Sequence, residues 1–130
     1  MRRSREHALL LLRKAGQDEY VVVKLLPDAG TPDEVLGFHL QQAIEKLLKA
    51  AVTNAGLEYE KTHDLAALMD LARGGGLEIP ARFEEVRYFT AFATELRYED
   101  TVQGSLDRKG GLALLQELRR WVEALLATSG

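Results

Sequence analysis

Side chains that can bind a phosphate group or move a proton occur in two short stretches of this chain. The first stretch, Lys61-Thr62-His63-Asp64, contains a histidine, and the second, Arg97-Tyr98-Glu99-Asp100, places an arginine beside a tyrosine. A guanidinium group binds phosphate oxygens through two parallel hydrogen bonds, and an imidazole changes its protonation near neutral pH. Together these residue types are suited to holding a phosphate group.

Each stretch also has a structural interpretation. His63 precedes a predicted helix, where its ring would satisfy a neighbouring carbonyl group, and we prefer this role to acid–base or phosphate chemistry. Arg97 has three carboxylates close by in the sequence, between positions 95 and 100. These carboxylates would either pair with the arginine at a helix end or steer it toward a ligand, and both interpretations stay open.

Two lysines of an earlier predicted helix add positive charge. Lys46 and Lys49 are three residues apart and therefore share a helix face, which makes a cooperative cationic pair feasible. If a nucleotide or phosphate binds, we expect it near Arg97, with these candidate neighbours: Tyr98, His63, Lys46 and Lys49.

Most other chemistry is absent from the sequence. With no cysteine, the chain has no disulfide, zinc–thiolate site or thiol nucleophile. The three histidines, His7, His39 and His63, lack metal-ligand spacing. Gly74-Gly75-Gly76 follows a helix and has no Lys-Ser/Thr after it, so it is not a phosphate loop. We expect no metal and no cofactor.

The composition indicates one domain over residues 1–130. The chain is 46% hydrophobic and 28% charged, with a formal net charge of -3 and a pI near 5.6. Such a chain has no overall basic field, so strong nucleic-acid binding is not expected. The apolar runs are too short to cross a bilayer. We expect a cytoplasmic protein with no membrane association.

Helical spacing of apolar residues predicts five helices, at 5–26, 31–55, 64–73, 80–98 and 107–125. The β-branched run at 20–23 is assigned to the first helix, because no second strand exists to pair with it. Thr31 and Glu34 have the spacing of a capping box that starts the second helix. In the first helix the inward positions are expected to be Leu9, Leu12, Tyr20, Val23 and Leu26. Five helices with short connections predict an all-α, up-and-down bundle.

Three motifs then resemble one family. Residues 41–50, QQAIEKLLKA, are similar to the second helix of HEPN domains (higher eukaryotes and prokaryotes nucleotide-binding domains). Residues 61–65, KTHDL, resemble the start of the third HEPN helix. Residues 97–100, RYED, resemble the end of the fourth, with Glu99 where proline is common. The order and spacing cover nearly the whole chain, and the resemblance implies a five-helix bundle like the substrate-binding subunits of nucleotidyltransferases.

The resemblance also implies a function. Small stand-alone HEPN proteins form homodimers, and many act with a minimal nucleotidyltransferase, as toxin–antitoxin pairs or as nucleotide-modifying units. HEPN ribonucleases carry an R-x4–6-H motif, but Val102, Gln103 and Gly104 stand where its histidine would follow Arg97. General acid–base catalysis typically supplies about 10²–10⁴-fold in rate, so little ribonuclease activity is expected. Arg2 and His7 also have the R-x4-H spacing, but they lie on the first helix and not at the position of the family motif. We interpret this spacing as coincidence.

The favoured hypothesis is therefore a non-catalytic, homodimeric protein that binds a nucleotidyltransferase partner and a nucleotide. The alternatives are a ribonuclease toxin with a degenerate site and a dimeric scaffold with no nucleotide ligand. Homodimerisation is also expected from a surplus of apolar residues on the last two helices, more than one seam on each can bury. These residues include Phe83, Phe89, Phe92 and Trp121.

Overall fold

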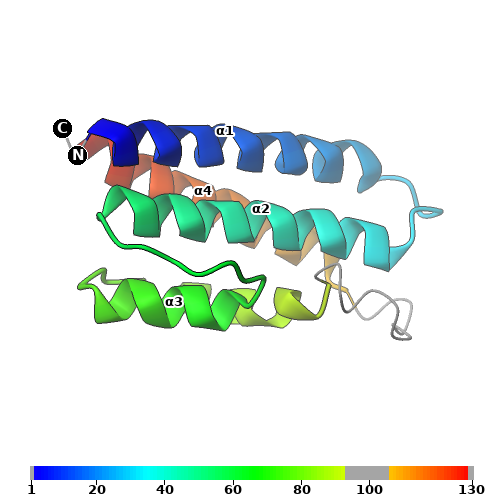
Figure 1. The fold of residues 1–130 in the computed structure, drawn as a ribbon. Coiled ribbons are helices and arrows are strands. Elements are labelled where there is room, and N and C mark those ends of the chain that lie inside the picture. The colour runs from blue at the N-terminus through cyan, green and yellow to red at the C-terminus, as the bar shows by residue number, and fades with distance from the viewer. Residues whose placement is uncertain (1, 93–105, 129–130) are drawn as a thin grey trace.

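Five helices make up the described part of the chain, residues 2–92 and 106–128 of a computed structural model (Figure 1). In order they are α1 (Arg2–Leu25), α2 (Asp33–Asn54), α3 (Leu65–Gly74), the 3₁₀ helix η1 (Ala81–Phe92) and α4 (Arg108–Thr128). The helices α1 and α2 run in opposite directions, whereas the loop after α2 crosses back along it, so α3 runs in the same direction as α2. The helix η1 then runs opposite to α3, and α4 runs opposite to η1. No strand occurs among these residues. The predicted all-α bundle of five helices is confirmed, and the α2–α3 connection departs from its up-and-down order. Within the described ranges, no helix combines the length and apolarity that crossing a membrane requires.

The central element is α2, which contacts each of the other four helices. Apolar residues at helical spacing form its core face, and each is at most 2% exposed: Leu36, Leu40, Ala43, Ile44, Leu47, Leu48 and Ala51. Because neighbours surround α2, most of its polar side chains are also drawn into the bundle, and this places the candidate site.

The inward face of α1 differs from the expected one. Ala8, Ala15 and Val22, spaced by two helical turns, are at most 2% exposed, and mostly small side chains therefore form the contact face. Leu12 and Leu26 pack against the core as expected. The expectation was wrong for three larger residues, which are 42%, 63% and 43% exposed: Leu9, Tyr20 and Val23. Alanines allow close approach of two helices, so size was a poor guide to burial here.

The start of α2 is held by a tertiary ion pair, and the predicted capping box of Thr31 and Glu34 is wrong. Pro32 is the N-cap residue, and no side chain caps the helix. Asp33 in the first turn is 2% exposed, and its carboxylate accepts a 2.8 Å hydrogen bond from Arg108 of α4. Two other helix ends have residues that are common at such positions. Asp64 caps the start of α3, and Gly56, with φ +79°, follows the end of α2.

The predicted helix at 80–98 is a 3₁₀ helix over its described part, Ala81–Phe92. Its buried residues Phe83, Val86 and Phe89 are spaced by three, and a helix with three residues per turn aligns such residues on one face. Phe92 continues this row, and its ring lies where a Cβ at Gly37 would be, so glycine permits the contact with α2. The rest of the predicted helix, residues 93–98, lies outside the described residues.

The four aromatic residues of η1 and α4 that the sequence indicated as surplus are used inside the bundle. Phe83 and Phe89 are buried, and Phe92 and Trp121 pack against the core. The rings of Phe83 and Trp121 are 5.9 Å apart. These residues do not form the exposed apolar patch that the sequence suggested, so that argument for a homodimer is wrong and a homodimer needs another surface.

Substitution of two aromatic residues of η1 tests which of its faces is buried. Phe83 is fully buried and Tyr88 is 78% exposed. Phe83→Ala should lower the free energy of unfolding by about 3–5 kcal/mol, because it removes a packed ring and leaves a cavity. Tyr88→Ala, the matched control, should change it by less than about 0.5 kcal/mol. Urea denaturation measures both values, and equal losses would contradict the assigned face.

Candidate functional site

The polar residues of the motif at 41–50 form a buried network on α2. Gln41 is fully buried and Glu45 is 4% exposed. Gln41 donates through Nε2 to Glu45 Oε1 at 3.0 Å and to the backbone carbonyl of His63 at 3.2 Å. Gln42 donates to Gln41 Oε1 at 2.7 Å. Gln41 and Glu45 are therefore not part of a solvated helix face.

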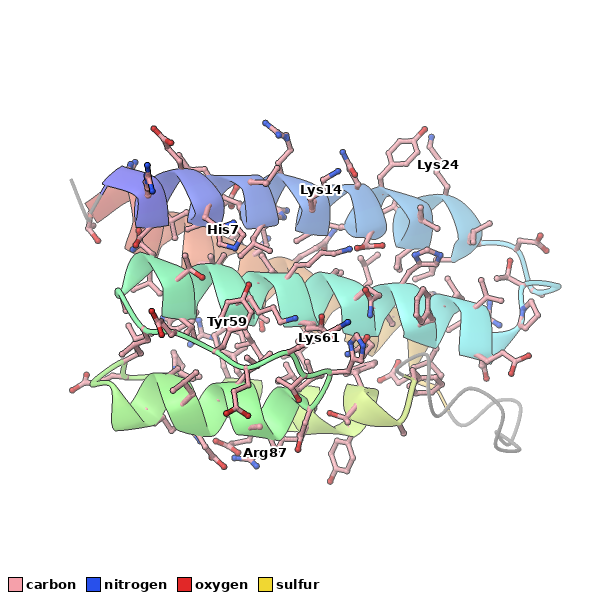
Figure 2. The ribbon with its side chains drawn as sticks, viewed as in Figure 1. His7, Lys14, Lys24, Tyr59, Lys61 and Arg87 are labelled. Atoms are coloured by element: carbon pink, nitrogen blue, oxygen red, sulfur yellow. The ribbon has the colours of Figure 1, made fainter. Side chains whose placement is uncertain are left out.

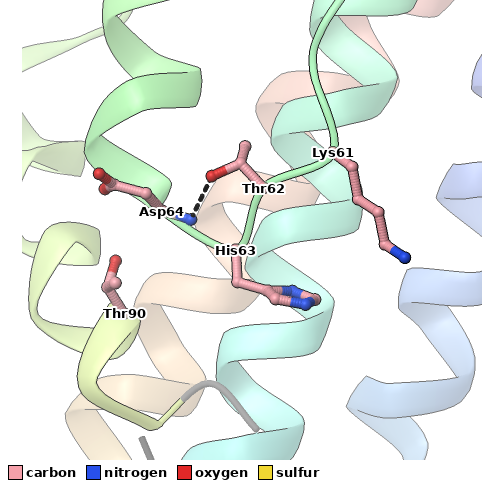
Figure 3. A pocket seen from close by; sticks show the side chains of 5 residues that line it. All are labelled: Lys61, Thr62, His63, Asp64 and Thr90. Atoms are coloured by element: carbon pink, nitrogen blue, oxygen red, sulfur yellow. Dashed lines mark hydrogen bonds between the residues drawn. The ribbon is translucent and has the colours of Figure 1, made fainter. Parts of the chain in front are cut away.

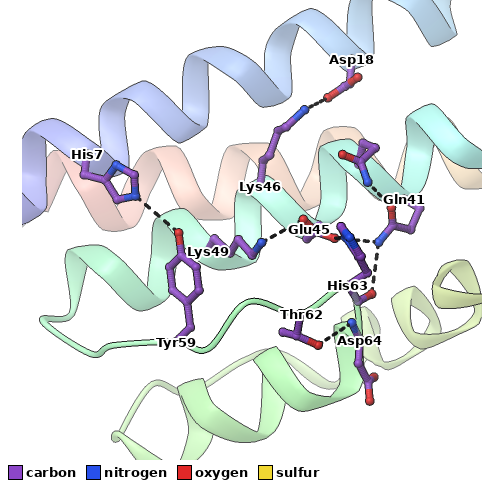
Figure 4. Close-up of polar contacts among 11 residues, drawn as sticks. His7, Asp18, Gln41, Glu45, Lys46, Lys49, Tyr59, Thr62, His63 and Asp64 are labelled. Atoms are coloured by element: carbon purple, nitrogen blue, oxygen red, sulfur yellow. Dashed lines mark hydrogen bonds and ion pairs between the residues drawn. The ribbon is translucent and has the colours of Figure 1, made fainter. Parts of the chain in front are cut away.

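The carboxylate of Glu45 lies at the centre of this network (Figure 4). Its Oε1 is 2.7 Å from His63 Nδ1, and its Oε2 accepts a 3.0 Å hydrogen bond from Lys49 Nζ. Burial raises the pKa of Glu45, but hydrogen bonds from His63, Lys49 and Gln41 outweigh that effect, so the pKa lies below its ordinary 4.5. Glu45 is therefore a carboxylate at neutral pH.

An ionised Glu45 determines how the imidazole of His63 is used. A carboxylate can only accept hydrogen bonds, so Nδ1 of His63 must carry a proton and donate it. The predicted structural role of His63 was to satisfy a carbonyl with its ring. Instead its ring binds a carboxylate, and its backbone carbonyl accepts from Gln41.

Lys49 extends the network toward α1. Its ammonium lies 5.2 Å from the centre of the Tyr59 ring, and the Tyr59 hydroxyl is 3.4 Å from His7 Nε2. Figure 4 shows Tyr59 rising from the loop between α2 and α3 toward His7 on α1. The loop is thus tied to both long helices by side chains.

Five residues were predicted to bind a ligand, and the structure brings two of them, His63 and Lys49, together on Glu45. It directs Lys46 elsewhere, to Asp18 of α1, which also binds His39 at 3.1 Å. Both lysines are therefore bound to carboxylates, and the cationic pair that their spacing suggested is neutralised. Arg97 and Tyr98 lie outside the described residues, as do positions 102–104.

An open pocket of about 470 Å³ adjoins His63 (Figure 3). It is lined by Lys61, Thr62, His63, Asp64 and Thr90. Sequence reasoning named only His63 among these as a ligand neighbour. Lys61 and Thr62 belong to the same motif as His63, KTHDL, and this motif was the sequence feature that could have identified them as pocket residues. Thr90 comes from η1, and no sequence pattern connects it to this loop. Among the described residues, no group of three metal-ligating side chains is assembled.

Comparison with known proteins gives one match. A family model described as "HEPN domain" matches residues 8–125. No curated protein and no solved structure matches the chain. The match includes α2 and the loop that carries His63, and so it covers the whole network around Glu45.

The lowered pKa of Glu45 predicts a specific dependence of stability on pH. A carboxyl whose pKa is lower in the folded protein contributes stability above its unfolded value, and this contribution is lost as pH falls through the folded pKa. Glu45→Gln should therefore lower the free energy of unfolding at pH 7 by about 1.5–3 kcal/mol. The difference from the wild type should shrink as the pH falls below the ordinary 4.5.

The matched control for this prediction is Glu34→Gln. Glu34 lies on the same helix and is exposed, so its substitution should leave the pH profile of stability close to that of the wild type. Urea denaturation at a series of pH values measures all three proteins. A constant difference between wild type and Glu45→Gln at every pH would show that the loss does not come from ionised Glu45.

Proposed function

The chain belongs to the HEPN domain family, and from this premise we propose that it is a non-catalytic, homodimeric nucleotide-binding protein that acts with a minimal nucleotidyltransferase. Membership itself supports a nucleotide-related or ribonuclease-type role. The nucleotidyltransferase partner rests on the resemblance to small stand-alone members of the family, which act as toxin–antitoxin pairs or nucleotide-modifying units. A gene for such an enzyme beside this one would support the partnership.

The observation that carries the nucleotide-binding proposal is the Glu45–His63 pair beside the open pocket. A buried carboxylate with three donors is weak evidence for stability, since apolar residues of similar volume often stabilise a core as well or better. What the network does is hold the His63 ring in one orientation at the pocket's edge. A positioned imidazole is a suitable partner for a phosphate oxygen, and this favours a ligand over a purely structural role.

Nucleotide binding is tested by calorimetric titration with ATP, GTP and a short oligonucleotide. Arg97, with Tyr98 beside it, is the proposed phosphate fork, and Arg97→Ala should weaken binding by about tenfold or more, because a hydrogen bond to a charged group contributes about 1.5–3 kcal/mol. If the wild type binds none of the three, the scaffold alternative replaces this proposal. If Arg97→Ala lowers only the melting temperature, the arginine is structural.

The second candidate is a ribonuclease toxin with a degenerate site. The Glu45–His63 pair favours it, because a histidine oriented by a carboxylate can transfer protons. The sequence opposes it, because Val102, Gln103 and Gly104 replace the histidine of the family motif. We expect the purified protein to leave single-stranded and structured RNA intact. Cleavage that is abolished by His63→Ala, and also by Arg97→Ala, would establish the ribonuclease instead.

An exposed face of α1 supports the homodimer. Leu9, Gly16 and Val23 are spaced by seven residues, and Tyr20 lies on the same side of the helix. Leu9, Tyr20 and Val23 are each more than 40% exposed, and a Cβ at Gly16 would meet nothing within 4 Å. A glycine between apolar side chains permits close approach of a second helix, and two-fold pairing would cover the stripe.

Light scattering should therefore report about twice the 14.5 kDa chain mass. Tyr20→Glu places a charge in the middle of the α1 stripe and should convert the dimer to a monomer. Tyr88→Glu is the matched control, because Tyr88 is a comparably exposed tyrosine on a different helix. A wild-type monomer at micromolar concentration would contradict the homodimer, and a dimer that survives Tyr20→Glu would place the interface elsewhere.

A further inference from the structure

The lysines of this region differ in what their ammonium groups bind. Lys46 binds Asp18 and Lys49 binds Glu45, so both charges are neutralised inside the bundle. Lys61, on the loop before α3, is exposed, and no carboxylate in the described parts of the chain pairs with it. Figure 2 shows it on the loop face that also carries Tyr59. Lys61 therefore brings positive charge to the pocket, where the two α2 lysines do not.

The two threonines of the pocket are arranged as hydrogen-bond donors. Thr62 Oγ1 accepts the backbone N–H of Asp64 at 3.0 Å, and Thr90 Oγ1 accepts the backbone N–H of Leu65 at 3.1 Å. A hydroxyl that already accepts one bond still has its own proton to donate. Both hydroxyls can thus donate to a ligand while they hold the start of α3 in place.

One carboxylate, Asp64, also lines the pocket and must be weighed against the donors. Its Oδ1 accepts the backbone N–H groups of Ala66 at 3.0 Å and Ala67 at 3.4 Å. It is therefore the cap of α3, and its charge is partly offset by the positive end of that helix, about half an elementary charge. Figure 3 shows Lys61 and His63 extending to the same side of the loop, away from the Asp64 carboxylate.

We propose that this pocket binds a phosphate group of the nucleotide, with Lys61 as the cation, Thr62 and Thr90 as neutral donors, and His63 oriented by Glu45. Four of the five residues that line the pocket carry a hydrogen-bond donor, and such donors suit a phosphate group, whose oxygens accept. The volume of about 470 Å³ falls within the range of small-ligand sites. The inference rests on the proposed nucleotide binding, and it adds these residues to Arg97 as groups that bind phosphate.

Calorimetric titration with two probes, ATP and inorganic tripolyphosphate, tests the assignment. Lys61→Gln should weaken the binding of each probe by about tenfold, because it removes one charge-assisted contact. Adenosine, which lacks phosphate, should bind the wild type and Lys61→Gln equally. Lys14→Gln is the matched control, since Lys14 is an exposed lysine on α1 (Figure 2), and it should bind both probes as the wild type does.

The outcomes separate this inference from the function on which it rests. If the wild type binds ATP and Lys61→Gln binds it equally well, the phosphate site is wrong while nucleotide binding stands. If the wild type binds tripolyphosphate in a Lys61-dependent manner but binds neither ATP nor GTP, the site is right and the proposed function is wrong. If tripolyphosphate does not bind at all, the site is wrong. Equal melting temperatures of Lys61→Gln and wild type exclude misfolding as the cause of a loss.

Discussion

The buried carboxylate of Glu45 is the constraint around which this part of the molecule is arranged. A carboxylate removed from water is costly unless charged or polar donors surround it. Here the donors come from two segments, with Gln41 and Lys49 from α2 and His63 from the loop before α3. Satisfying one buried charge therefore fixes where the loop crosses α2, and with it the position of the pocket and the first residue of α3.

Partly buried ion pairs also join the long helices α1, α2 and α4. Asp18 on α1 binds Lys46 and His39 of α2, while Arg119 of α4 binds Glu19 of α1 at 2.7 Å. These ion pairs lie where α1 packs against α2 and α4. Partly buried ion pairs of this kind add little net stability. They do disfavour other registers, since a shifted helix would leave a half-buried charge without its partner. Apolar burial thus stabilises the bundle, and the ion pairs select its register.

How far the sequence predicts this structure depends on what each pattern encodes. The period of α2 predicted its core because the apolar residues at that spacing are buried against the neighbouring helices. In α1 the same reasoning failed, because Ala8 and Ala15 are inward while Leu9 is outward, and hydrophobicity does not reveal close approach. The sequence places Gln41 and Glu45 on the second helix, but nothing in a helical repeat says that a polar residue will be covered by a distant loop.

Thr90 shows why the pocket itself lay beyond sequence reasoning. Its place is set by the aromatic row of η1, where residues three apart face α2 and α4 and leave the next position turned toward the start of α3. From there its hydroxyl accepts the N–H of Leu65, a group at the N-terminus of a helix that has no acceptor within that helix. Packing of Phe89 thus determines the polar contact between Thr90 and Leu65, which are 25 positions apart in the chain. The donor character of the pocket follows from core packing on one side and from the charge of Glu45 on the other, and these two requirements meet only in the folded chain.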